Sequence, residues 1–141
     1  MTQTTATATK RKTAETKLSK AEQERLTRLG KDMACIYLSD HGFKILERDW
    51  KGNTGTIALV AEEGNALVFL DVITRAVTQP GFPEEKERDQ RRQFFESLVL
   101  EYLKEHSWPR GPVRYDIIAI CMTGKEQCLL RHHRDALGAA G

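Results

Sequence analysis

ALVFLDVI, at residues Ala66–Ile73, is the stretch that decides the fold. It is nearly continuous apolar sequence, and Asp71 is its only charged residue. A strand with one wet face alternates apolar and polar residues, whereas a strand covered on both faces is apolar throughout. The stretch therefore predicts the central strand of a sheet that has other layers packed on both faces.

The segments before this strand predict a helix and two further strands. Ser19-Lys20-Ala21-Glu22 is a capping-box pattern, so a helix begins there, and apolar residues at three- and four-residue steps extend it to about residue 40. Residues 43–50 and 56–61 are predicted strands, separated by turns at residues 51–55 and 62–65. The predicted order is thus one helix followed by three strands, of which the central strand is the third.

The segments after it predict a long helix and one or two more strands. Pro80 and Pro83 break the pattern, and a helical period then continues to about His106. Val113–Met122 is a predicted strand, and residues 126–131 are a short last one. The predicted fold class is α/β of the α+β kind, with a mixed central sheet flanked by helices.

The length of 141 residues predicts one domain with tails. We expect a disordered basic arm at residues 1–18, a single domain at residues 19–131 and a flexible tail at residues 132–141, in which His132 and His133 have no metal-binding role. The three cysteines form no CxxC pair and predict reduced thiols. The start does not resemble an export signal and no apolar run is long enough to span a membrane, so we expect a cytoplasmic, non-membrane protein.

The positive charge is concentrated at the amino-terminal end of the sequence. Residues 1–28 contain seven of the 22 Lys and Arg residues but three of the 20 Asp and Glu residues. The remaining residues are slightly acidic, so the net charge of +2 does not by itself indicate a basic nucleic-acid-binding face.

Several segments together resemble the YraN-type bacterial proteins, an uncharacterised family (UPF 0102) in the restriction-endonuclease-like PD-(D/E)XK superfamily. The resemblance rests on order, spacing and glycines over residues 30–34, 37–38, 42–50, 55–60, 67–75 and 114–118, together with Gly81, Pro83 and Glu84. It implies a restriction-endonuclease-like core, in which a helix Glu, a Glu and an Asp on one strand, and a Glu-x-Lys on the next form the nuclease site. At these positions this sequence has Lys31, Thr56, Ala58, and Asp71 with Ile73.

Only Asp71 retains a carboxylate at these five positions. A nuclease that uses Mg²⁺ needs a cluster of hard oxygen ligands to hold the ion and activate water. Ala58 and Ile73 offer no ligand, and Thr56 offers only a neutral hydroxyl. We therefore predict that the protein is catalytically inactive and needs no cofactor. We further hypothesise that Lys31 pairs with Asp71 and replaces the metal.

The candidate nucleic-acid contacts are basic residues near the predicted strand ends: Arg48, Lys51, Arg75 and Arg114. Guanidinium groups suit phosphate, so they predict weak, salt-sensitive binding of DNA or RNA. Two alternatives stay open. The protein could be an active nuclease that uses Mg²⁺ or Mn²⁺ through relocated carboxylates, or a protein-interaction module that binds no nucleic acid. The relocated ligands would come from Asp32, Glu47, Asp49, Glu62 and Glu63.

Overall fold

The computed structural model describes residues 18–76, 88–124 and 127–136. The predicted arm therefore lies outside the described residues apart from Leu18, and so does the predicted tail beyond Ala136. The cysteines are free thiols. No helix in the described part of the chain is long and apolar enough to cross a membrane.

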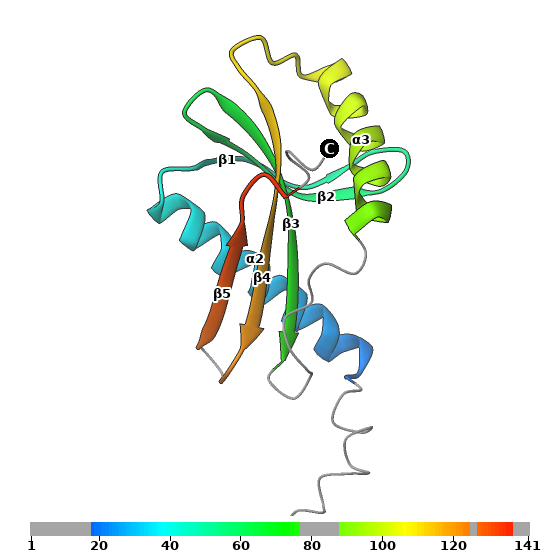
Figure 1. Cartoon of the computed structure of the whole chain (residues 1–141). Coiled ribbons are helices and arrows are strands. Elements are labelled where there is room, and N and C mark those ends of the chain that lie inside the picture. The colour runs from blue at the N-terminus through cyan, green and yellow to red at the C-terminus, as the bar shows by residue number, and fades with distance from the viewer. Residues whose placement is uncertain (1–17, 77–87, 125–126, 137–141) are drawn as a thin grey trace, which may run out of the picture.

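In the described part of the chain, two helices flank the sheet (Figure 1). Helix α2 spans Lys20–Asp40 and begins with the predicted capping box. The Glu22 backbone N–H donates to the Ser19 hydroxyl at 3.0 Å, and the Ser19 N–H donates to the Glu22 carboxylate at 2.9 Å. This reciprocal pair satisfies two amides that a helix start otherwise leaves unpaired. Helix α3 spans Arg88–Glu105.

The five strands form one mixed sheet in the order β1-β2-β3-β4-β5. Strands β1, β2 and β3 make an antiparallel meander, β3 and β4 are parallel, and β5 is antiparallel to β4. The predicted α+β class and element order are confirmed. The strands span Lys44–Lys51, Thr56–Glu63, Ala66–Ala76, Val113–Met122 and Cys128–His133.

The last strand extends beyond its predicted end. His132 pairs with Ile118 and His133 with Ile117, so both histidines belong to β5 although the sequence suggested that a tail begins at residue 132. The two polar histidines carry no strand pattern of their own, and β5 includes them because it pairs with β4 along that length.

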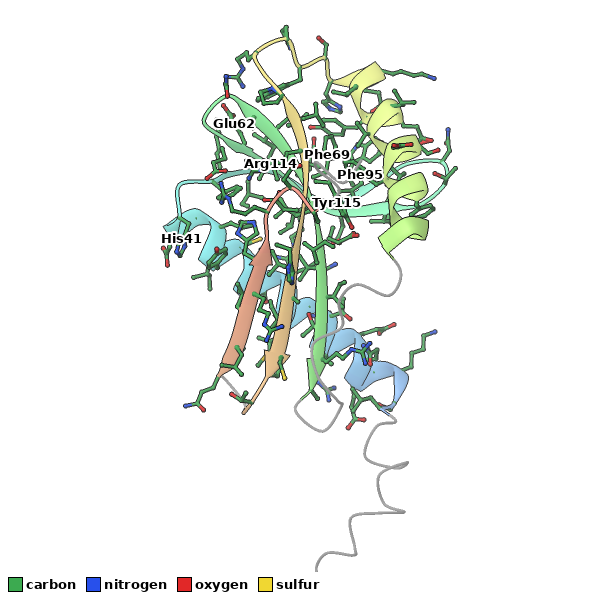
Figure 2. The ribbon with its side chains drawn as sticks, viewed as in Figure 1. His41, Glu62, Phe69, Phe95, Arg114 and Tyr115 are labelled. Carbon is green, nitrogen blue, oxygen red and sulfur yellow. The ribbon has the colours of Figure 1, made fainter. Side chains whose placement is uncertain are left out.

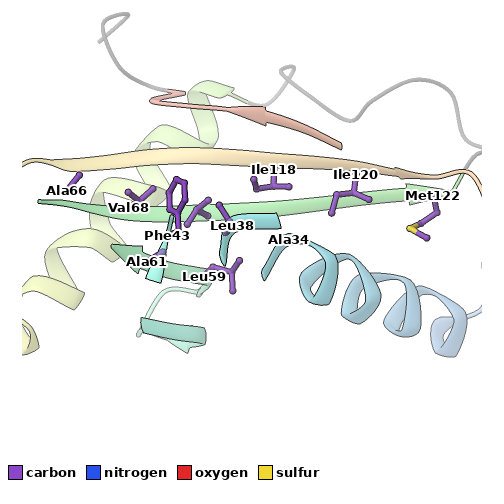
Figure 3. Close-up of a cluster of buried hydrophobic side chains, with 11 residues drawn as sticks. Ala34, Leu38, Phe43, Leu59, Ala61, Ala66, Val68, Ile118, Ile120 and Met122 are labelled. Atoms are coloured by element: carbon purple, nitrogen blue, oxygen red, sulfur yellow. The ribbon is translucent and has the colours of Figure 1, made fainter. Parts of the chain in front are cut away.

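Strand β3 is covered on both faces, as its apolar sequence predicts. Val68 and Leu70 pack with Leu38 of α2 on one face. Leu67 and Phe69 pack on the other face with a cluster that includes side chains of α3. Figure 3 shows the α2-side cluster, in which residues of β2, β3 and β4 meet α2. The two faces of one strand therefore anchor two separate hydrophobic cores.

Helix α2 approaches β3 most closely at Gly30. A Cβ added to Gly30 would overlap the Thr74 hydroxyl oxygen and come within 2.9 Å of the Thr74 Cβ. Gly30 is a buried residue in the middle of α2, a position where glycine lowers helix stability relative to alanine. Close packing of helix on strand therefore explains the glycine.

Gly30→Ala should lower the free energy of unfolding by about 1–3 kcal/mol, because overpacking outweighs the gain in helix propensity. Adding Thr74→Ala should restore part of the loss, since it removes the overlapping hydroxyl. Urea unfolding measures both effects. Gly124→Ala is the control because its nearest neighbour, Gln127 Oε1, lies at 3.5 Å. An unchanged stability in Gly30→Ala would contradict the packing explanation.

Candidate functional site

Asp71 lies in a small pocket between the sheet and α3. The pocket has a volume of about 100 Å³. Strand β2 contributes one hydroxyl through Thr56, β3 contributes Asp71, and most of the remaining wall is apolar or aromatic. We call it the Asp71 pocket, and it is lined by Thr56, Ile57, Phe69, Leu70, Asp71, Phe94, Phe95, Leu98 and Tyr115.

The Tyr115 hydroxyl donates a hydrogen bond to the Asp71 carboxylate. Tyr115 comes from β4, and its ring packs against Phe95 of α3 with centroids 4.4 Å apart. The Phe95 ring also packs against Phe69, with ring centroids 5.8 Å apart. Figure 2 shows these three labelled rings gathered where α3 faces the sheet. The aromatic contacts hold Tyr115 in place, and Tyr115 in turn orients the Asp71 carboxylate.

Thr56 and Asp71 come together in this pocket, as their positions on neighbouring strands suggested. Ala58 and Asp71 each adjoin the paired residues Leu59 and Leu70. Ile73 lies further along β3, opposite Ala119 of β4. The two strands thus bring their candidate positions to one region of the sheet.

Lys31 lies elsewhere, and the hypothesis of a Lys31–Asp71 ion pair is wrong. Its ammonium group pairs with Asp49 of β1, which has a positive φ of 54°. Helix α2 packs on the face of the sheet that carries Val68 and Leu70, whereas Asp71 faces α3. Opposite faces of a sheet cannot share one side-chain cluster, so Lys31 takes a partner on the edge strand.

The basic residues chosen from the sequence have different environments. Arg48 donates to Asp32 at 2.8 Å. Lys51 is exposed at the end of β1 and pairs in the ladder with Thr56 of the Asp71 pocket. Arg75 is half-buried near the end of β3. Arg114 belongs to a buried polar network, in which its guanidinium group donates to Asp116 and Glu63.

Three cross-strand rows continue from Asp71 over β4 to β5. Because alternate residues of a strand share a face, these rows point toward the same side as Asp71. Arg131 lies in the middle row and was not among the basic residues chosen from the sequence. The alternation of side chains along β5 is the signal that assigns it to this face. We call this surface the Asp71 face, and its rows are Asp71–Ile117–His133, Ile73–Ala119–Arg131 and Arg75–Cys121–Leu129.

The buried network around Asp116 lies on the opposite face of the sheet. Asp116 is fully buried and accepts two hydrogen bonds from Arg114, each at 2.9 Å. It also bonds His132 Nε2 at 2.7 Å and the Asp135 backbone N–H at 2.9 Å. The other ring nitrogen of His132 meets the Tyr37 hydroxyl at 2.9 Å. The network ties β4, β5 and α2 together.

The charges of this network depend on one another. Burial would raise the pKa of Asp116, but hydrogen bonds from His132, Arg114 and Asp135 outweigh it and lower the pKa to about 2. Glu63 accepts from Arg114 at 2.8 Å, and hydrogen bonds from its arginine partners overcome burial and lower its pKa as well. Arg114 therefore links Glu63 of β2 to Asp116 of β4 through its guanidinium group.

A comparison with protein families identifies the group to which the chain belongs. The family model described as "Uncharacterised protein family UPF0102" matches residues 30–120. The chain belongs to the UPF0102 family. A UPF0102 protein of Rhodococcus opacus (strain B4) is 36% identical over 107 residues, which cover 76% of this chain and 91% of the relative. One of Parafrankia sp. (strain EAN1pec) is 31% identical over 113 residues, which cover 80% and 96%.

The UPF0102 match confirms the family predicted from the sequence and includes every residue of the Asp71 pocket. It also includes Arg114 and Asp116 but ends before β5, which supplies His132. The pocket is thus contained in the part of the chain that matches the family model, while the Asp116 network is completed by residues beyond it.

Asp116→Asn should destabilise the protein by about 3 kcal/mol at pH 7, because Arg114 loses its buried charged partner. The wild type should itself lose about 2 kcal/mol as the pH falls from about 4 to about 2. The sign follows from the lowered pKa of Asp116 in the folded state, because the stabilisation is present above the unfolded-state pKa and is lost as the folded carboxylate is protonated.

Denaturant unfolding at pH 7, 4 and 2 measures both effects. The exposed Asp40 supplies the control variant Asp40→Asn, which should keep the acid dependence of the wild type. If Asp116→Asn and the wild type lose equal stability between pH 4 and pH 2, Asp116 is not the group responsible.

Proposed function

We propose that this UPF0102 protein contacts nucleic acid through the Asp71 face and does not cleave it. The observation that carries the proposal is the environment of Asp71. At the position where the resemblance to restriction-endonuclease-like proteins implies a metal ligand, the carboxylate is bound by the Tyr115 hydroxyl inside an aromatic pocket.

The residue types around Asp71 oppose metal-dependent hydrolysis. Divalent Mg²⁺ requires several oxygen ligands and a position for water, and the attacking water must be activated. Thr56 brings one neutral hydroxyl into the Asp71 pocket, and Ile73 replaces the lysine that the resemblance implies. The Tyr115 hydroxyl donates a hydrogen bond to the Asp71 carboxylate, so it competes with a cation for that oxygen. These groups support binding chemistry better than phosphodiester hydrolysis.

The spare carboxylates do not favour a relocated nuclease site. Asp49 pairs with Lys31, Asp32 with Arg48 at 2.8 Å, and Glu63 with Arg114 at 2.8 Å. Glu62 lies 3.1 Å from Arg110, and Glu47 lies 3.8 Å from His106. Each of these five carboxylates faces a basic side chain, which stabilises the fold and competes with a bound cation.

Positive groups on the Asp71 face support contact with a phosphate backbone. Arg75 and Arg131 lie in adjacent rows on β3 and β5, and Lys51 borders the pocket through its pairing with Thr56. Guanidinium groups bind phosphate through paired hydrogen bonds. Because the residues beyond position 28 are slightly acidic overall, we expect weak binding that decreases steeply with salt.

Binding to labelled single-stranded and duplex DNA and to RNA should be detectable at low salt with EDTA present. The double variant Arg75→Ala/Arg131→Ala should weaken binding by at least about fivefold and reduce its salt dependence. Lys44→Ala/Lys104→Ala removes equal charge from exposed positions outside the Asp71 face and should have little effect. A mobility-shift titration provides the measurement.

Deleting residues 1–17 separates the contribution of the amino-terminal end from that of the Asp71 face. If the shortened protein no longer binds, or if both double variants weaken binding equally, the Asp71 face is not the contact surface. Incubation of the same nucleic acids with Mg²⁺ or Mn²⁺ should leave them intact. Cleavage that disappears in Asp71→Asn would overturn the proposal of a non-cleaving protein.

A further inference from the structure

We infer that a groove beside the amino-terminal half of α2 binds a partner protein, through a short acidic segment that carries a bulky apolar side chain. The groove has a volume of about 500 Å³ and lies between α2 and the end of β3. We call it the α2 groove, and Leu26 and Leu29 of α2 and Ala76 of β3 are among its lining residues. It is separate from the Asp71 face, because α2 packs on the opposite face of the sheet.

The α2 groove forms because the helix continues past the place where it touches the sheet. Helix α2 approaches β3 most closely where Gly30 meets Thr74. The turns of α2 before Gly30, blue in Figure 1, lie to one side of the end of β3, and residues 20–25 are exposed throughout. Strand β2 pairs with β3 only between Ala66 and Leu70, so the described strand beside the last residues of β3 is β4. The start of the helix and the end of the strand therefore border a groove.

The floor of the α2 groove is apolar. Leu18, Leu26 and Leu29 line it from the helix side, and Ala76 lines it from the strand side. The three leucines are half-buried, and Leu26 and Leu29 pack at the margin of the α2-side hydrophobic core. The groove has the size of pockets that take small ligands, which range over about 300–1,000 Å³. A bulky apolar side chain that enters it would cover leucine surface that the fold leaves partly exposed.

The two acidic residues that line the α2 groove are already engaged. The Glu22 carboxylate accepts a hydrogen bond from the Ser19 backbone N–H at 2.9 Å in the capping box. The Asp32 carboxylate accepts one from Arg48 at 2.8 Å. Each carboxylate is therefore held by a group outside the groove lining, which leaves it poorly placed to attract a cation into the groove.

The two basic residues of the α2 groove remain available. Arg25 and Arg28 are exposed, and neither forms a hydrogen bond or an ion pair with a residue that the structure describes. They are three residues apart on one helix, so their side chains are neighbours on its surface. A guanidinium group binds a carboxylate through two parallel hydrogen bonds. The rim of the groove thus complements an acidic segment and repels a basic one.

The combination of floor and rim favours a protein segment over a nucleic acid. Single-stranded nucleic acid is bound by stacking its bases on aromatic rings, and no aromatic side chain of the described residues lines the α2 groove. Leucines beside arginines suit instead a peptide in which an apolar side chain is flanked by Asp or Glu. The occupant inferred here is such a segment on another protein.

The test uses the fluorescein-labelled peptide Glu-Glu-Phe-Leu-Glu-Glu. Lys-Lys-Phe-Leu-Lys-Lys inverts its charge, and Glu-Glu-Ser-Ala-Glu-Glu removes its bulky apolar side chains. Fluorescence anisotropy with the full chain should show binding of the first peptide at least about tenfold tighter than that of either control. Amide NMR shifts at Leu26, Leu29 and Ala76 should accompany this binding.

Arg25→Glu/Arg28→Glu should reverse the order of the two charged peptides, because the rim then complements lysine. A gain of binding for the lysine peptide also shows that this variant is folded. Lys44→Glu/Lys104→Glu makes the same change of charge at exposed positions away from the α2 groove and should keep the wild-type order. Arg75→Ala/Arg131→Ala should leave peptide binding unchanged, so failure of the proposed nucleic-acid contact leaves this inference standing.

Absence of peptide binding by the wild type, or equal binding of the three peptides, overturns the inference. Displacement of the acidic peptide by oligo-dT of eight nucleotides also overturns it, since the groove then binds nucleic acid. A third contrary outcome concerns the chain itself, because residues 77–87 follow Ala76 and contain Phe82, Glu84 and Glu85. If the acidic peptide binds only to the variant Phe82→Ser/Glu84→Gln/Glu85→Gln, the chain fills its own groove and no partner is needed.

Discussion

The parallel pairing of β3 with β4 is the constraint on which the rest of the structure depends. Two parallel neighbours cannot be joined by a tight turn, so the chain crosses one face of the sheet between them, and α3 lies in that connection. Helix α2 then covers the other face of β3. This arrangement explains why β3 is apolar on both faces and why the only charge in its apolar run, Asp71, falls where α3 meets the sheet.

The two covered faces carry two different polar arrangements. On the α2 side, Asp116 is saturated by Arg114, His132 and the backbone of Asp135, so its charge is fully used in holding β4 and β5 to α2. On the α3 side, Asp71 accepts a hydrogen bond from Tyr115 in a pocket that is also lined by the exposed Phe94. A saturated buried charge such as that of Asp116 stabilises the fold.

Sequence reasoning recovered the features that depend on neighbouring residues. The capping box, the period of α2, the run of β3 and the order of elements are local patterns, and each is present where it was predicted. The five candidate positions were chosen from the family resemblance, and the structure brings two of them, Thr56 and Asp71, into one pocket. The failures were the partner of Lys31 and the end of β5 at His133. Each failure involves residues that meet only across the sheet or at its edge.

The sequence by itself determined the elements, the family and the residues at the five positions that the resemblance singled out, because these depend on local spacing and residue type. Only the tertiary structure decided which carboxylate meets which cation. Arg114 and Asp116 are two residues apart and share a face of β4, yet their network also needs Glu63, His132 and Tyr37 from three other elements. Likewise, Tyr115 reaches Asp71 because β4 lies parallel to β3 in one register. Side-chain partners depend on register and on the choice of face, and both are fixed when the sheet assembles.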